Sequence, residues 1–158
     1  MSEAEALETT CCVAAPLAAS LPRCPVSQTS GQPVGWTTVA ALSLGAIPPR
    51  QEVWLCMDPA CDAVYFGDRG LQLLSAQLRA VPAFKIGSEG VACHCFQHSQ
   101  RTIEQEVRAL GSSPTVDAIR ARVRNRDCAC EVRNPTGKCC LRDIQQLVDR
   151  TNEQGAQR

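Results

Sequence analysis

Eleven cysteines occur among the 158 residues of this chain, and the last eight fall into four close pairs. The pairs are a C-x4-C at Cys56 and Cys61, two C-x-C motifs at Cys93/Cys95 and Cys128/Cys130, and a vicinal pair at Cys139 and Cys140. Clustered thiolates are typical ligands of soft metals and iron–sulfur clusters. The pattern therefore predicts a fold built around one or two metal centres.

The N-terminus argues for reduced cysteines. It reads MSEAEALETT and has no lysine or arginine before Arg23, unlike a secretory signal. The sequence also lacks a run of about 20 apolar residues that would span a membrane. We therefore expect a cytoplasmic protein, in which thiols stay reduced and serve as metal ligands. A disulfide scaffold, which an odd cysteine count fits poorly, and unrelated buried thiols remain the alternatives.

Composition narrows the class of protein further. Aromatic residues make up only 4% of the chain, so its core needs support from metals. The formal net charge is zero and no basic stripe stands out, so we expect no nucleic-acid partner. There is no Ser/His/Asp set, paired-carboxylate pattern or phosphate loop, which favours an electron carrier or binding protein over an enzyme.

The first half of the chain reads as β-rich. Residues 1–21 are expected to be flexible, and residues 22–89 form the first folded half. Apolar runs at 53–55 and 64–66 predict two strands, and the turn between them carries Cys56 and Cys61. This layout resembles a zinc knuckle, in which a hairpin tip places two thiolates side by side. A short helix is expected at 37–44.

The second half reads as helical. Residues 90–150 contain three apolar stripes with helical spacing, at 100–110, 114–123 and 141–149, and the cysteine pairs lie at the helix ends. Residues 151–158 are polar and are expected to form a disordered tail. The predicted fold class is α+β, with a small zinc-stapled β-rich half and a three-helix half.

The cysteines of the helical half suit a two-iron cluster. In a C-x-C motif both side chains can turn toward one iron, and two thiolates from a distant segment would hold the second. Helix N-termini stabilise such an anionic centre, and Cys140 directly precedes the last helix, while Cys95 lies near the first. A four-cysteine zinc site is the alternative, although the commoner C-x2-C spacing is absent. His94 and His98 are expected to be exposed polar residues rather than ligands.

Two segments resemble a known family. V-A-C-H-C-F at 91–96 and C-E-V-R-N-P-T-G-K-C-C-L at 130–141 are similar to the N-terminal domain of CopZ-type copper metallochaperones. The helical half of that domain in turn resembles bacterioferritin-associated ferredoxin. The resemblance covers roughly residues 24–150, and the N-P-x-G loop before the vicinal cysteines is its most specific part. It implies one 2Fe–2S cluster and one zinc ion.

The resemblance also implies ligands for both centres. Cys93, Cys95, Cys130 and Cys140 match the cluster ligands, and Cys128 is the alternative to Cys130. Cys24, Cys56 and Cys61 match the zinc site, but Ser27 stands where the relatives have the second cysteine of C-P-x-C. Cys12, with Cys11 as the alternative, would supply the fourth thiolate. A zinc ion with four thiolate ligands would be structural rather than catalytic.

The predicted function is one-electron transfer in metal handling, for example reduction of Cu(II) to Cu(I). The expected partner is a redox protein or a copper chaperone or transporter. A metal-stapled interaction module without redox activity is one alternative. The other is a protein that binds or senses copper or mercury through its vicinal thiols.

Overall fold

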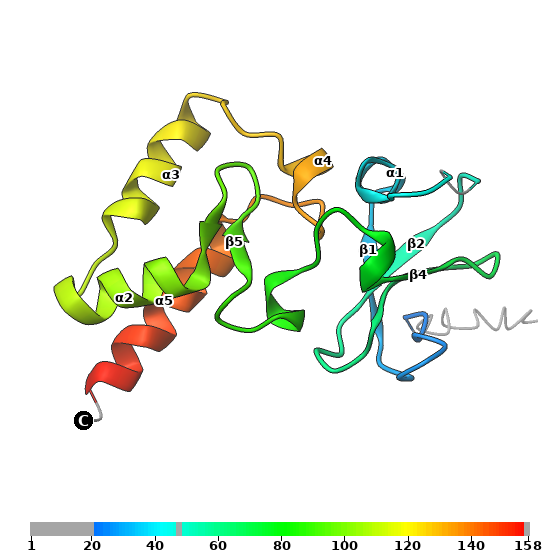
Figure 1. The fold of residues 1–158 in the computed structure, drawn as a ribbon, viewed down its shortest axis with the longest axis horizontal. Coiled ribbons are helices and arrows are strands. Elements are labelled where there is room, and N and C mark those ends of the chain that lie inside the picture. The colour runs from blue at the N-terminus through cyan, green and yellow to red at the C-terminus, as the bar shows by residue number, and fades with distance from the viewer. Residues whose placement is uncertain (1–20, 47–48, 157–158) are drawn as a thin grey trace, which may run out of the picture.

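The computed structural model describes residues 21–46 and 49–156. A half with an antiparallel sheet lies beside a half made mainly of helices (Figure 1). This confirms the predicted α+β class. The expected flexible segment at 1–21 lies, apart from Leu21, outside the described residues. Within the described ranges, no helix is both long and apolar enough to cross a bilayer.

The sheet has four antiparallel strands in the order β1-β2-β3-β4. They are β1 at Gly31–Val34, β2 at Val53–Cys56, β3 at Ala63–Gly67 and β4 at Gln72–Leu74. The predicted strands at 53–55 and 64–66 are therefore confirmed as β2 and β3. A single helix, α1 at Trp36–Leu42, connects β1 with the rest of the sheet.

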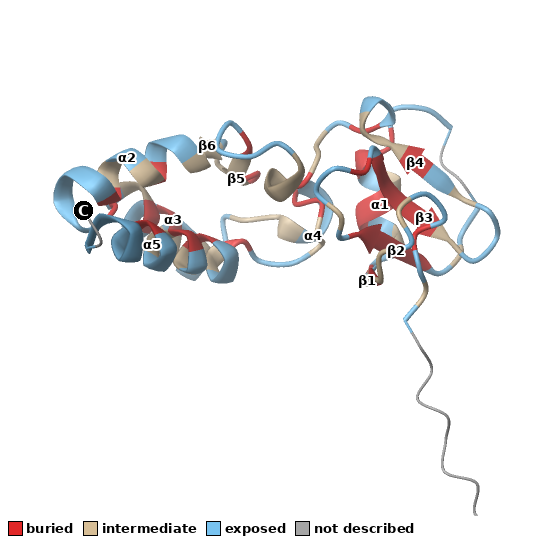
Figure 2. Ribbon diagram, turned by 90° about the horizontal axis from the view of Figure 1, so that it is seen from below, coloured by how far each residue is buried: buried red, intermediate tan, exposed pale blue. Residues whose placement is uncertain are grey.

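The sheet buries side chains on both faces because successive residues of a strand point to opposite sides. Val53 and Leu55 of β2 join the core that includes residues of α1, whereas Trp54 and Cys56 join a separate cluster. That second cluster also contains Cys24, Cys61, Ala63 and Phe66. Figure 2 shows how the buried residues concentrate on the central strands. The first cysteine group thus forms part of a small apolar core of its own.

Strand β1 was not anticipated, because its sequence G-Q-P-V resembles a turn. Pro33 is tolerated because β1 is an edge strand, where a missing backbone N–H leaves no interior ladder bond unmade. Gly31 is required by packing: a Cβ there would lie 2.5 Å from Cζ of Phe66 and 2.7 Å from Cβ of Trp54. A strand therefore forms where composition alone indicated a loop.

The helical half contains a short hairpin and four helices. The hairpin strands are β5 at Val91–Cys93 and β6 at His98–Ser99, and the helices are α2 at Gln100–Leu110, α3 at Pro114–Arg124, α4 at Cys130–Arg133 and α5 at Leu141–Ala156. Ile103, Val107, Val116, Ile119, Ile144 and Leu147 form the core between α2, α3 and α5. Cys93, Cys95 and Cys140 belong to the same buried cluster.

The helix ends follow local signals in the sequence. The hydroxyl oxygens of Ser99 and Ser113 accept hydrogen bonds from the backbone at the starts of α2 and α3. Gly111, with φ of 72°, ends α2 in the left-handed conformation. The carboxylate of Glu106 accepts further bonds from Ser113 and Thr115, which fixes the α2–α3 corner.

The structure corrects the prediction at the C-terminus. Helix α5 continues to Ala156, so residues 151–156 are helical and do not form the expected disordered tail. Thr151 explains the difference. Its side chain is buried and its hydroxyl donates to the carbonyl of Leu147 at 2.8 Å, which extends the apolar stripe by another turn. A threonine at this position does not register as apolar in the sequence pattern.

Two hydrogen bonds join the halves. The hydroxyl of Thr38 in α1 donates to the carbonyl of Glu131 in α4 at 2.7 Å. The hydroxyl of Tyr65 in β3 donates to the carbonyl of Pro135 at 2.6 Å, and burial raises the pKa of this phenol. Both acceptors lie on the segment between Cys130 and Cys140, so the sheet half holds the backbone that carries two cysteines of the helical half.

Replacing Tyr65 with phenylalanine tests this connection. We expect Tyr65→Phe to lower the free energy of unfolding by about 1–2 kcal/mol, because the buried carbonyl of Pro135 loses its donor. Hydrogen exchange should accelerate at residues 130–140. Ser43→Ala is a matched control, since Ser43 donates to Val39 within the sheet half at 2.8 Å. Unchanged exchange at 130–140 in Tyr65→Phe would contradict the connection.

Candidate metal centres

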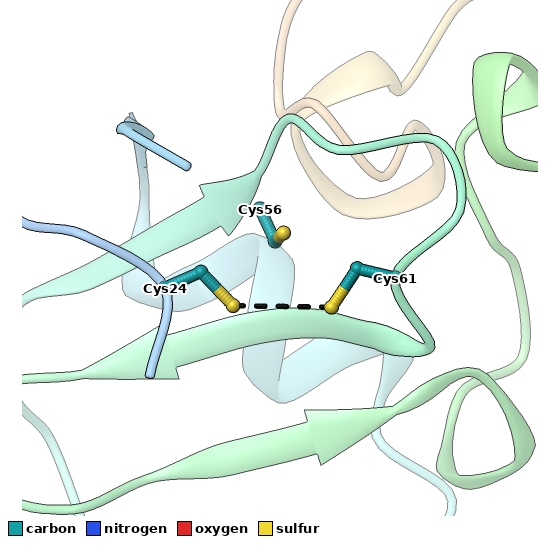
Figure 3. Close-up of side chains that lie close together, drawn as sticks. All are labelled: Cys24, Cys56 and Cys61. Atoms are coloured by element: carbon teal, nitrogen blue, oxygen red, sulfur yellow. Dashed lines mark hydrogen bonds between the residues drawn. The ribbon is translucent and has the colours of Figure 1, made fainter. Parts of the chain in front are cut away.

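Cys24, Cys56 and Cys61 converge on one point (Figure 3). Their sulfur atoms all lie within 4.8 Å of one another, and those of Cys24 and Cys61 are 4.0 Å apart. Cys56 ends β2, Cys61 precedes β3, and Cys24 lies in the turn before β1. All three side chains are buried. The predicted pairing of the knuckle with Cys24 is thus reproduced in space.

Hydrogen bonds in the loop between Cys56 and Cys61 fix the positions of these two thiols. The carboxylate of Asp58 accepts from the backbone N–H of Ala60 at 2.9 Å, which shapes the loop between Cys56 and Cys61. The ammonium group of Lys85 donates to the carbonyls of Asp58 and Cys61 at 2.7 and 2.9 Å. These bonds hold the loop from outside and leave its sulfur atoms directed inward.

The environment favours ionisation of one thiol of this group. Burial disfavours the thiolate of Cys24, but backbone hydrogen bonds from Ser27 and Val26 outweigh burial and lower its pKa to about 7. Burial raises the pKa of Cys61. A metal binds thiolates and displaces their protons, so the lowered pKa of Cys24 makes the proton of this thiol easier to displace.

The described donors at this site are three sulfurs and one hydroxyl. The hydroxyl oxygen of Ser27 lies 3.4 Å from the sulfur of Cys56. Tetrahedral zinc takes four ligands, and a neutral hydroxyl is a weak one beside three thiolates. Cys12 and Cys11, the predicted sources of the fourth thiolate, lie outside the described residues.

A second group of cysteines gathers in the helical half. Cys95 lies in the loop between β5 and β6, and Cys130 begins α4. Their sulfur atoms are 3.7 Å apart, and the backbone N–H of Ala129 donates to the sulfur of Cys95 at 3.3 Å. Segments separated by two helices in the sequence thus meet, as the spacing of the pairs predicts.

Cys93 and Cys140 form the other contact of this group. A hydrogen bond from Cys140 is the main influence that lowers the pKa of Cys93 to about 6, and it raises the pKa of Cys140 together with burial. Both side chains are buried. The 3.7 Å contact between Cys95 and Cys130 therefore runs between segments, whereas the sequence predicted that Cys93 and Cys95 would bind one iron.

The remaining cysteines differ in exposure. Cys128 is half-buried, and Cys139 is exposed. Cys139 lies in a groove of about 770 Å³ that Met57, Phe84, Lys138 and Arg142 also line. The vicinal pair is therefore split: Cys140 turns into the protein beside Cys93, and Cys139 faces the groove.

Three features near the second cysteine group differ from the sequence expectations. His94 was expected to be exposed, but it is buried with 8% of its surface accessible, and burial lowers its pKa. His94 lies in the β5–β6 loop and is one of the residues that line the groove beside Cys139. The short helix α4 was also missed, because four residues are too few to show helical periodicity. His98 is half-buried rather than fully exposed.

Comparisons with known proteins agree with this architecture. Residues 21–79 match the family model of a zinc-binding domain, zf_CopZ, and this range contains Cys24, Cys56 and Cys61. The chain is also similar to the X-ray structure of the N-terminal domain of CopZ from Archaeoglobus fulgidus. That match has a TM-score of 0.63 and 22% sequence identity, and covers 80% of this chain and 97% of the other. No curated protein matched the chain.

These findings establish a CopZ-like fold and a cysteine cluster suited to a soft metal such as zinc. The zinc-binding match covers the sheet half, and the structural match extends into the helical half. At 22% identity the structural likeness speaks for the fold alone.

Proposed function

We propose that this chain is a small redox protein that holds one zinc ion and one 2Fe–2S cluster and transfers single electrons in metal handling. Residues 22–89 would form the zinc-binding half, and residues 90–150 a three-helix half like bacterioferritin-associated ferredoxin. The observation that carries the proposal is that four cysteines from distant segments gather in the helical half: the sulfurs of Cys95 and Cys130 are 3.7 Å apart, and Cys93 and Cys140 lie in the same buried cluster.

This arrangement favours two iron ions over one zinc ion. In a tetrahedral site with Zn–S bonds of about 2.3 Å, every pair of sulfurs lies about 3.8 Å apart. Among the described residues, only Cys24, Cys56 and Cys61 place three donor atoms within 4.8 Å of one another. In the helical half, the sulfurs of Cys95 and Cys130 are 3.7 Å apart, a spacing that a single metal ion accepts, and Cys93 and Cys140 lie together in the same buried cluster. We assign Cys95 and Cys130 to one iron, and Cys93 and Cys140 to the other.

The protein environment would supply the rest of the cluster site. The N–H of Ala129 donates to Cys95, and the guanidinium of Arg133 donates to the carbonyl of Cys95 at 3.3 Å. Hydrogen bonds to ligand sulfurs and nearby positive charge tune the potential of an iron–sulfur centre. When bound, the cluster would accept and release single electrons. The residues of this chain hold it, shield it and set its electrostatic surroundings.

Chemical analysis tests the proposal. The protein purified without oxygen should contain zinc, together with iron and acid-labile sulfide in equal amounts. Its visible absorption should bleach on addition of dithionite. A colourless protein that contains zinc alone would contradict the redox proposal and favour a metal-stapled interaction module. For the thiol-sensor alternative, the burial of Cys140 disfavours chelation by the vicinal pair Cys139 and Cys140, whereas the other vicinal pair, Cys11 and Cys12, lies outside the described residues.

The fourth zinc ligand is proposed to be Cys12, and Ser27 provides a sharp test. Cys11→Ser/Cys12→Ser should lower zinc affinity by at least about tenfold, since one thiolate is lost. Adding Ser27→Cys to that variant should restore affinity, because the hydroxyl of Ser27 already lies 3.4 Å from the sulfur of Cys56. Competition with a chromophoric chelator measures the affinity, and cobalt substitution reports the number of sulfur ligands. Unchanged affinity in the double variant would exclude Cys11 and Cys12 as ligands.

The likeness to the CopZ N-terminal domain supports a proposal about the partner, and the expected reduced thiols support one about the location. We place the protein in the cytoplasm beside a redox partner or a copper chaperone or transporter. Reduction of Cu(II) to Cu(I) is the reaction that we assign to it. Anaerobic mixing of the dithionite-reduced, desalted protein with Cu(II) and a Cu(I)-specific chelator would measure this step, and the absence of Cu(I) would count against it.

A further inference from the structure

The charge of this chain is unevenly distributed. The formal net charge is zero, with 16 basic and 16 acidic residues. Between positions 120 and 143, however, seven lysines and arginines stand against only three acidic residues, Asp127, Glu131 and Asp143. The rest of the chain carries the compensating negative charge. The basic excess falls on the segments that carry Cys128, Cys130, Cys139 and Cys140.

Five of these basic residues form what we term the basic rim. The rim consists of Arg122, Arg124, Arg133, Lys138 and Arg142, all of which are exposed. Within the described part of the chain, only Arg122 of the five makes an ion pair, a 3.9 Å contact with Asp127. The other four charges are available to a partner.

Contacts place four members of the rim, all except Arg124, beside the second cysteine group. The guanidinium of Arg122 lies 3.8 Å from the ring centre of Phe96, next to Cys95. Arg133 donates to the carbonyl of Cys95. Lys138 and Arg142 line the groove beside the exposed Cys139. Within the rim, the side chains of Cys128 and Cys130 remain partly exposed, and so does Val132 at 38%.

We propose that the basic rim is the docking surface for the acidic face of an electron-transfer protein, an inference that rests on the proposed function. An electron must pass where the redox centre is nearest the surface, and the partly exposed cysteines mark that place. Unpaired positive charges around it attract an acidic partner over distances of about 10 Å and orient its approach. Redox encounters of this kind use small interfaces and dissociate quickly.

A protein partner fits better than a nucleic acid. A nucleic-acid surface presents a run of basic residues that follows a phosphate backbone. Here Glu131 interrupts the rim, and Val132 adds an exposed apolar side chain between the charges. A mixed surface with an apolar centre and a charged periphery is typical of protein–protein contacts.

Two small probes measure the sign of the field at the redox centre. The reduced protein is mixed with ferricyanide, which takes one electron to become ferrocyanide, or with hexaamminecobalt(III), which is reduced to cobalt(II). The rate with ferricyanide should fall about three- to tenfold as ionic strength rises from about 0.01 to about 0.2 M, since salt screens the attraction. The rate with the cobalt complex should rise or stay constant.

Charge reversal provides the matched comparison. Lys138→Glu/Arg142→Glu should remove most of the salt dependence with ferricyanide. Arg69→Glu/Arg79→Glu makes the same change in net charge on the sheet half, where both arginines are exposed, and should leave it intact. Equal effects of the two double variants would overturn the proposal, as would rates insensitive to salt. Rates insensitive to salt would mean that the basic rim only offsets the negative charge of the cluster.

A thiol probe separates failure of this inference from failure of the proposed function. The thiolate of Cys139 attacks a disulfide reagent, forms a mixed disulfide and releases one thiol of the reagent. The dianionic reagent dithiobis(nitrobenzoate) should react faster at low salt, whereas neutral dithiodipyridine should not, whether or not iron is bound. Loss of the reaction in Cys139→Ser would show that the measured rate belongs to the thiol of Cys139. Tight binding of a duplex DNA oligomer that Lys138→Glu/Arg142→Glu abolishes would overturn the choice of a protein partner.

Discussion

Cys140→Ala is expected to abolish the visible absorption of the proposed iron–sulfur centre, whereas Cys139→Ala is expected to preserve it. The two residues are adjacent in the sequence but differ in environment. Cys140 is buried in the same cluster as Cys93, and Cys139 is exposed in the groove. Removal of one of four thiolates leaves an iron ion with an incomplete set of ligands, so the cluster should be lost or greatly reduced in occupancy. Iron analysis and the visible spectrum measure the effect.

The paired design excludes a general effect of substitution. Both variants shorten a side chain on the same stretch before α5, and both should retain zinc because that site lies in the sheet half. Cys128→Ala extends the test to the alternative ligand, which is only half-buried, and it should keep its iron. Loss of colour in Cys139→Ala with retention in Cys140→Ala would reverse the assignment of the vicinal pair.

Removal of zinc is expected to unfold the sheet half. Structural zinc sites contribute on the order of 10 kcal/mol of apparent binding free energy at neutral pH. The core around Cys24, Cys56 and Cys61 is small, with Trp54 and Phe66 as its only aromatic side chains among the described residues. We expect Cys56→Ser or treatment with a strong chelator to release zinc and to remove the near-ultraviolet circular dichroism signal of Trp54.

Zinc restoration and a cysteine substitution in the helical half provide the controls for that result. The chelated protein should recover its signal when zinc is restored, and Cys56→Ser should not. Cys128→Ser should behave like the unmodified chain in the same assay. A zinc-free protein with an unchanged dichroism spectrum would show that the apolar core alone sustains the sheet, and the metal would then have another role.

The zinc-site geometry could be predicted from the sequence because it depends on local features. Strands β2 and β3 show apolar runs on either side of a short turn, and a turn of this length forces Cys56 and Cys61 together. Helices α2 and α3 can likewise be predicted from their apolar spacing and from the caps at Ser113 and Gly111. Where a residue pattern and a turn signal agree, tertiary packing only confirms the local preference.

The second cysteine group could be predicted only in outline. The sequence indicated that Cys93, Cys95, Cys130 and Cys140 would meet, but not which sulfurs would be neighbours. That pairing depends on the β5–β6 hairpin, whose two-residue strand β6 is too short to recognise, and on α4. Both elements are stabilised by contacts with distant residues, such as the bond from Thr38 to Glu131. Local sequence patterns do not indicate such long-range contacts.

The bonds from Thr38 and Tyr65 imply an order of maturation. The backbone between Cys130 and Cys140 rests on α1 and β3, which can take their places only after the sheet has assembled. On the proposed function, a nascent chain would therefore acquire zinc before its helical half could form a complete site for the iron and sulfide that are delivered to it. Cells short of zinc would accumulate this protein without iron, even when iron is plentiful.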